Sequence, residues 1–241
     1  MKHVVSAACG LWLACAGWAQ AQVSVDRMTS PVVVELYTSQ GCSSCPPADA
    51  ILGRLSSDPR VIALALHVDY WDYLGWKDVF ARAEHTKRQK DYARAAGRKM
   101  VFTPQMIVNG QDSVVGNDAG AVEETIRRHA ATRTKGPDIR LTVTREGGQI
   151  VIRAEAVPPS DRAYRVQLVR YQPRDTVEIG RGENAGHTVE YFNIVTSWQT
   201  LGEWRAGKPV VMTASAPGPD RTVIVVQDER MGAVMAAAEL R

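Results

Sequence analysis

Cysteine is scarce in this chain, with four residues in a sequence of 241. The cysteines and histidines do not stand at the spacing of a zinc finger, so the sequence predicts no structural zinc site. Charge of one sign is lacking as well, because 29 Lys and Arg residues stand against 26 Asp and Glu residues, a net charge of +3. This balance gives no indication of nucleic-acid binding or of attachment to a membrane surface.

A hydrophobic run long enough to span a membrane is also missing at the N-terminus. The apolar stretch from Val4 to Ala19 is interrupted by two glycines and is shorter than the ~20 residues that a span needs. A short basic start precedes it, and Ala19-Gln20-Ala21 matches a signal-peptidase site. Residues 1–21 are therefore predicted to be a secretory signal peptide.

Cleavage of this segment would leave few cysteines. Cys9 and Cys15 lie inside it, so the mature chain would keep Cys42 and Cys45 alone. Export leads to an oxidising compartment, in which structural disulfides persist. The sequence thus predicts a secreted protein, periplasmic in a bacterium, with no stable membrane insertion after cleavage.

Cys42 and Cys45 form a C-x-x-C pair between an apolar strand and a helix. A disulfide that closes so short a loop removes little chain entropy and adds little stability, so reactivity explains the pair better. Free N–H groups and the dipole at a helix start favour a thiolate. Pro46 disfavours helical angles at Cys45. We therefore expect Cys45 at the N-cap and Cys42 outside the regular helix.

Residues 22–135 are predicted to form an α/β domain with the order β-α-β-α-β-β-α and a mixed four-stranded sheet. The Asn109-Gly110 turn predicts the hairpin, and the sequence places a loop rich in aromatic residues after the second strand. The expected strands are 31–38, 61–68, 105–108 and 112–115, and the expected helices are 46–55, 77–96 and about 118–131.

Residues 136–241 alternate apolar and polar side chains between turn signals, which predicts a second, all-β domain with a sandwich-like fold. Its loop 181–187 is polar and rich in glycine, and we expect a turn there or a segment that reaches the cysteines. The expected strands are 139–144, 149–156, 165–171, 188–195, 209–215 and 222–227.

The element order, the C-x-x-C pair after the first strand and Thr103-Pro104 before the hairpin resemble the thioredoxin superfamily. The segments VELYTSQGCSSCPPAD, HVDYWDYLGW, FTPQMIVNG and RGENAGHTVEY resemble, more narrowly, a family of secreted bacterial thioredoxin-like proteins without an assigned activity. The resemblance implies a cis bond before Pro104, with Thr103 and Pro104 shaping a substrate site. It also implies that Cys42 is the nucleophile and Cys45 the resolving cysteine.

Three further predictions concern residues around the cysteines. The superfamily carries a buried acid that moves the proton of the resolving cysteine, and Glu35 is the candidate, although it precedes Cys42 by one residue more than in that pattern. Glu35 in a structural pair is the alternative. Tyr70 and Trp71 are candidates for a substrate groove or for core packing. His67 is interpreted as a satisfied histidine, and the basic side chains of residues 87–99 as a solvated helix face.

These residues favour an exported thiol–disulfide oxidoreductase that works through a mixed disulfide. Protein thiols or disulfides would be its substrates, with an unidentified redox partner and with no cofactor and no resident metal. Two alternatives stay open. In the first, the protein handles Cu(I), which the same two thiolates suit. In the second, the protein is a non-catalytic binding module.

Overall fold

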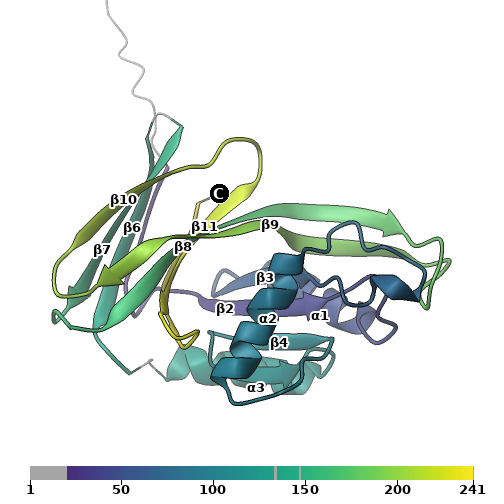
Figure 1. Cartoon of the computed structure of the whole chain (residues 1–241). Coiled ribbons are helices and arrows are strands. Elements are labelled where there is room, and N and C mark those ends of the chain that lie inside the picture. Colours follow the sequence, from purple (N-terminus) through teal and green to yellow (C-terminus); the bar gives the residue numbers. More distant parts are fainter. Residues whose placement is uncertain (1–20, 133–134, 147, 241) are drawn as a thin grey trace, which may run out of the picture.

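A computed structural model describes residues 21–132, 135–146 and 148–240. The predicted signal peptide, residues 1–21, lies outside the described residues except for Ala21. The described chain is a mixed α/β fold, largely of strands, with three α-helices (Figure 1). Within it, no helix is long and apolar enough to cross a membrane.

The first half follows the predicted order of elements. The apolar run of β2 lies in the middle of a sheet, parallel to β3 and antiparallel to β4, and every residue of β2 is buried. Asp118 caps α3 by accepting a hydrogen bond from the backbone N–H of Ala121, at 3.0 Å. The elements are β2 (Val32–Thr38), α1 (Pro46–Leu55), β3 (Val61–His67), α2 (Ala83–Ala95), β4 (Gln105–Val108), β5 (Asp112–Val115) and α3 (Ala119–Ala131).

Helix α2 begins six residues later than predicted, at Ala83 rather than Lys77. A 3₁₀ turn, η1 (Asp72–Leu74), and an extended segment precede it. The side chain of Asp78 holds this segment, since its Oδ1 accepts from the N–H of Phe80. The N–H of Arg82 donates to the carbonyl of His67, which fixes Arg82 in an extended conformation before the helix. Tertiary contacts of residues 78–82 are therefore the reason why α2 begins at Ala83.

The second half consists of strands, and two of the twelve in the described chain were not predicted. These are β1 (Gln22–Val25) and β12 (Val234–Leu240). β8 (Ala163–Glu178) and β9 (Thr188–Arg205) are far longer than expected and form a hairpin whose strand β9 lies beside β3 and contacts α1 (Figure 1). The remaining strands are β6 (Asp138–Glu146), β7 (Gln149–Val157), β10 (Val210–Ser215) and β11 (Arg221–Asp228).

The sheets cross the boundary predicted at residue 135. One sheet has eight strands in the order β12-β11-β8-β9-β3-β2-β4-β5, and β3 joins β9 by parallel pairing of Ala65 with Ile194. The expected four-stranded sheet is therefore one half of a larger sheet rather than a sheet of its own. The second sheet, β1-β6-β7-β10, takes its edge strand β1 from the N-terminal side of the boundary.

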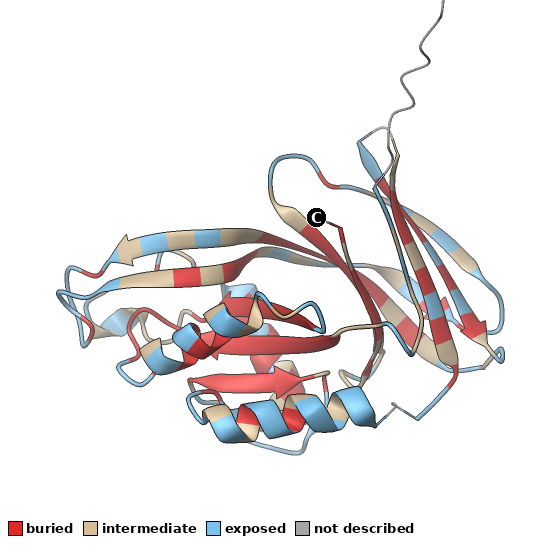
Figure 2. Ribbon diagram, turned by 180° about the vertical axis from the view of Figure 1, so that it is seen from behind, coloured by how far each residue is buried: buried red, intermediate tan, exposed pale blue. Residues whose placement is uncertain are grey.

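The hydrophobic core has three parts, and the buried stretches of the strands are red in Figure 2. One lies between the four-stranded sheet and the β8, β11 and β12 strands. The other two cover opposite faces of β2 and β3, because successive side chains of a strand alternate in direction. Val34 and Leu36 pack with α1, whereas Val33 and Tyr37 pack with Tyr92 of α2. This alternation decides which site each residue of β2 can join.

Candidate active site

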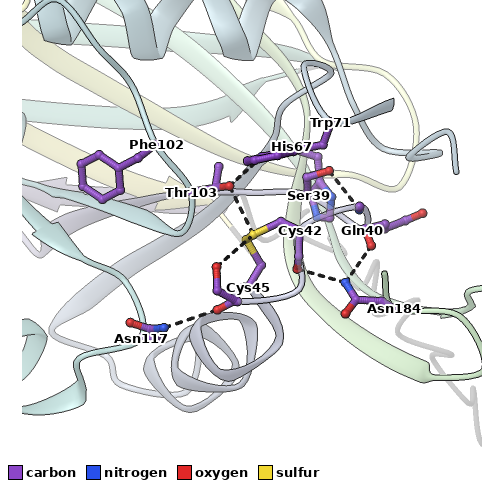
Figure 3. Close-up of a disulfide and its surroundings, with 12 residues drawn as sticks. Ser39, Gln40, Cys42, Cys45, His67, Trp71, Phe102, Thr103, Asn117 and Asn184 are labelled. Atoms are coloured by element: carbon purple, nitrogen blue, oxygen red, sulfur yellow. Dashed lines mark hydrogen bonds between the residues drawn. A yellow bond between two sulfur atoms is a disulfide. The ribbon is translucent and has the colours of Figure 1, made fainter. Parts of the chain in front are cut away.

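Cys42 and Cys45 form a disulfide at the N-terminus of α1, with their Cα atoms 5.4 Å apart (Figure 3). Both residues are buried, Cys42 at 3% exposure and Cys45 at 0%. Cys45 is the N-cap, as predicted, but its angles are helical, with φ −80° and ψ −35°. The expectation that Pro46 forces Cys45 out of the helical region is wrong, since the preference against helical angles before proline is statistical.

Thr103 contacts the sulfur of Cys42, and Trp71 contacts Thr103. The hydroxyl of Thr103 donates to Cys42 Sγ at 3.2 Å, and Trp71 Nε1–H donates to Thr103 Oγ1 at 2.7 Å (Figure 3). The Thr103–Pro104 peptide bond is cis. The chain of two donors points toward the sulfur, so it would stabilise negative charge there.

Replacing Thr103 by valine is expected to make Cys42 less reactive in the reduced protein. Valine keeps the shape but removes the donor, and a hydrogen bond to a charged group contributes about 1.5–3 kcal/mol. The loss of that bond to the thiolate should slow alkylation of Cys42 by iodoacetamide at pH 7 about tenfold or more. Thr103→Ser, which keeps the hydroxyl, is the matched control. Equal alkylation rates for the valine and serine variants would show that the hydroxyl does not act on the thiolate.

Asn184 ties the β8–β9 hairpin to the cysteine loop. Its side-chain amide donates to the backbone carbonyls of Gln40, at 2.9 Å, and of Cys42, at 3.0 Å. Asn184 is 3% exposed. Trp76 fixes the same loop by donating from its Nε1 to Gln40 Oε1, at 2.8 Å. The loop 181–187 meets both expectations, since it contains turns at Ala185 and His187 and also reaches the cysteines.

The other aromatic residues of the loop after β3 have separate positions. Tyr70 packs against the core beside α2 and donates from its hydroxyl to Gln89 Oε1, at 3.1 Å. Trp71 packs against the same core while its N–H reaches Thr103. Tyr73 is 77% exposed. Trp71 thus joins the cysteines, and Tyr70 has the packing role that was the alternative.

Glu35 does not join the cysteines. Its carboxylate accepts two hydrogen bonds from Arg88, at 2.7 and 2.8 Å, and one each from the hydroxyls of Tyr37 and Tyr92. Glu35 shares the face of β2 that packs on α2, whereas Leu36, six residues before Cys42, faces α1. Because successive side chains of a strand point to opposite faces, a shift of one residue along β2 moves the side chain to the other face of the sheet. Arg88 is 8% exposed, so its assignment to a solvated helix face is wrong.

Behind the disulfide lies a buried ion pair, in which Asp78 is the partner expected for His67 as a satisfied histidine. His67 Nδ1 and Asp78 Oδ2 are 2.7 Å apart, and both side chains are fully buried. Asp78 Oδ2 also accepts from the backbone N–H of Gln40 in the cysteine loop, at 2.8 Å. Burial alone would lower the pKa of His67, but the carboxylates of Asp78 and Asp49 outweigh it and raise that pKa. Burial would raise the pKa of Asp78, yet His67 holds it below its usual value.

Asp49 is the second acid on this side of the sheet. It lies in the first turn of α1 and is 4% exposed. Burial raises the pKa of Asp49 to about 7, against the attraction of His67. The one sequence feature that could have indicated Asp49 as a site residue is its position four residues after Cys45, because residues at that spacing are neighbours on a helix.

The family described as "Protein of unknown function (DUF1223)" matches residues 33–227, a span that contains every residue of the site. The chain belongs to the DUF1223 family. No curated protein matches it.

This DUF1223 chain is similar to two proteins of solved structure. Protein AGR_C_4864 from Agrobacterium tumefaciens is 31% identical, with a TM-score of 0.72 over 87% of this chain and 93% of that one. HBP35 of Porphyromonas gingivalis is 12% identical, with a TM-score of 0.56 over 88% of this chain and 75% of that one. The second likeness concerns the fold alone.

The DUF1223 site contains a disulfide, hydrogen-bond donors and buried acids. Among the residues that the structure describes, no group of three or more His, Cys, Asp and Glu side chains is placed to hold a metal ion. The arrangement can open and close one disulfide, stabilise a thiolate at Cys42 and hold a proton near Cys45.

Proposed function

We propose that this protein is an exported thiol–disulfide oxidoreductase. The observation that carries the proposal is the hydrogen bond from Thr103, the residue before a cis proline, to the sulfur of Cys42 in a C-x-x-C disulfide. A donor aimed at one sulfur stabilises the thiolate that attacks a substrate. The thioredoxin-like character of residues 22–135 is part of this proposal, supported by the element order and the Thr103–Pro104 bond.

The proposed reaction passes through a mixed disulfide. The thiolate of Cys42 attacks one sulfur of a substrate disulfide, whose S–S bond breaks, and the other substrate sulfur leaves as a thiolate that takes a proton. Cys45 loses its proton and attacks Cys42 Sγ, which releases the second substrate thiolate. Two electrons pass from the dithiol to the substrate, and oxidation of a substrate dithiol follows the same steps in reverse. A redox partner then restores the starting state.

Export is the second part of the proposal. The basic start, the apolar stretch and Ala19-Gln20-Ala21 support a signal peptide over residues 1–21. A periplasmic location would supply unfolded or disulfide-bonded proteins as substrates. Secretion into the periplasm, with cleavage after Ala21, can be read from the N-terminal sequence of the protein recovered there.

A disulfide-exchange assay tests the activity. With oxidised glutathione as the probe, the reduced Cys45→Ser variant is expected to accumulate a stable mixed disulfide at Cys42, because no resolving thiol is left. Cys42→Ser should accumulate little, since Cys45 is fully buried. Mass spectrometry of the intact protein counts the adducts. No adduct in either variant would refute the oxidoreductase, and stoichiometric Cu(I) binding that both substitutions abolish would support the copper alternative.

A further inference from the structure

Asp49 lies one helical turn after the resolving cysteine. Its backbone N–H donates to the carbonyl of Cys45, at 3.1 Å. Cys45 has helical angles, so the side chains of Cys45 and Asp49 leave the same face of α1 as neighbours. Cys45 and Asp49 are 0% and 4% exposed. A carboxyl group is therefore enclosed with the thiol that must lose a proton.

His67 approaches this carboxyl group from the sheet. It ends β3 on the face of Ala63 and Ala65, which pack against α1. Within the described chain, His67 Nε2 and Asp49 Oδ1 make no hydrogen bond of good geometry, although the Thr38 hydroxyl lies close enough to the Asp49 carboxyl group to lower its pKa. Buried polar atoms almost always have partners. His67 and Asp49 are linked by electrostatic attraction, which lowers the pKa of Asp49 and raises the pKa of His67.

The surroundings keep the two acids in different protonation states. Asp78 pairs with His67 Nδ1 and stays ionised, whereas burial keeps Asp49 protonated up to near-neutral pH. Three other titratable groups face this cluster. Tyr191 of β9 has its ring 4.9 Å from that of His67, and His85 of α2 bonds to the carbonyl of His67. Asp72 of η1 accepts from the backbone N–H of Asp78. Two neighbouring acids whose pKa values are shifted in opposite directions are typical of a site that transfers protons.

We propose that Asp49 accepts the proton of Cys45 when the mixed disulfide is resolved, and that His67, held by Asp78, is the positioning residue that stabilises the Asp49 carboxylate. This inference rests on the proposed function. The proton passes from Cys45 Sγ to the Asp49 carboxylate, and the Cys45 thiolate attacks Cys42 Sγ. The bond between Cys42 and the substrate sulfur breaks, and Asp49 gives its proton to solvent, where the released thiolate takes one up. In the opposite direction Asp49 returns the proton to Cys45.

Two rates measured with oxidised glutathione test this assignment. The first is formation of the mixed disulfide in a Cys45→Ser background, and the second is its resolution when Cys45 is present. Asp49→Asn should leave the first rate within about twofold and slow the second about 100-fold at pH 7, the usual size of a general-base contribution. The difference should shrink above about pH 9, where a free thiol ionises unaided. Glu124→Gln, at an exposed carboxyl group of α3, is the control.

His67→Gln should shift the pH profile of the second rate without abolishing it, as a positioning residue requires. A second rate and pH profile unchanged by Asp49→Asn would overturn the inference. Absence of any mixed disulfide in Cys45→Ser would instead refute the proposed function, so the two failures are distinguishable. If Asp49→Asn does not fold, the ¹³C carboxyl titration of Asp49 in the wild type decides. Its midpoint must differ between the disulfide and dithiol forms, and equal midpoints would overturn the inference.

Discussion

Replacing Arg88 by methionine is expected to lower the free energy of unfolding by about 3–5 kcal/mol, because it leaves a buried carboxylate without its cation. Arg88 binds Glu35 through two parallel hydrogen bonds, and its guanidinium lies over the ring of Trp198, 3.6 Å from the centroid. Methionine fills much of the same volume but neutralises nothing. Urea unfolding of the disulfide form at pH 7, followed by circular dichroism, measures the change.

Two controls separate the charge from the packing. Lys87→Met removes a neighbouring cation that is 74% exposed, and it should cost well under 1 kcal/mol. The double variant Glu35→Gln with Arg88→Met removes both charges and should recover most of the lost stability. A double variant as unstable as Arg88→Met would show that Arg88 acts through packing rather than through the charge of Glu35.

The contacts of Arg88 also explain why the two predicted halves share one structure. Arg88 Nη2 donates to Gln227 Oε1 of β11 at 3.2 Å, and Nη1 lies 3.4 Å from Gln167 Oε1 of β8. On the opposite side of the sheet, Asn184 reaches the cysteine loop. The strands after residue 136 therefore hold both the buried ion pair and the C-x-x-C loop in place. Arg88→Met should consequently lower the stability of the whole fold in one transition.

Local patterns were enough to predict the elements that position the cysteines. The continuous apolar runs of β2 and β3, the Asn109-Gly110 turn and the C-x-x-C pair before α1 are features of short segments, and they were found where expected. The approach of Thr103 to Cys42 followed from topology, since β4 runs antiparallel to β2 and begins at the cysteine end of the sheet. Each of these predictions needed one strand and its immediate neighbours.

Features set by distant contacts were missed. β12 contains three successive alanines, which have low strand propensity, yet they are buried by pairing with β11. The face of Glu35 depended on one residue of loop length, and a sequence pattern does not fix that length. Arg88 resembled its solvated neighbours on α2 because the partner that buries it, Trp198, is more than one hundred residues away. Asp49 was overlooked because nothing local shows that the hairpin and β3 bury it.

Replacing Asp49 by asparagine is expected to stabilise the folded protein at pH 8 by up to about 4 kcal/mol, while leaving its stability near pH 4 almost unchanged. The pKa of Asp49 is raised from 3.8 to about 7 in the folded state, and a tenfold change in an acid's ionisation constant corresponds to about 1.4 kcal/mol. Between these two pKa values the folded state keeps a proton that the unfolded state releases, so rising pH destabilises the fold through this group. Above about pH 7 the loss is complete.

Urea unfolding of the disulfide form at pH 4, 6 and 8 measures this slope for the wild type and for Asp49→Asn, with Glu124→Gln as the exposed control. His67 and Asp78 contribute their own pH dependence to both proteins, so the difference between the two curves is the relevant quantity. Parallel curves would show that the Asp49 carboxyl group does not titrate between these pH values, and a less stable asparagine variant at pH 8 would make Asp49 a structural partner. A carboxyl group that weakens the fold at the pH where it ionises is instead explained by its chemistry beside Cys45, since sites that act on protons commonly give up stability.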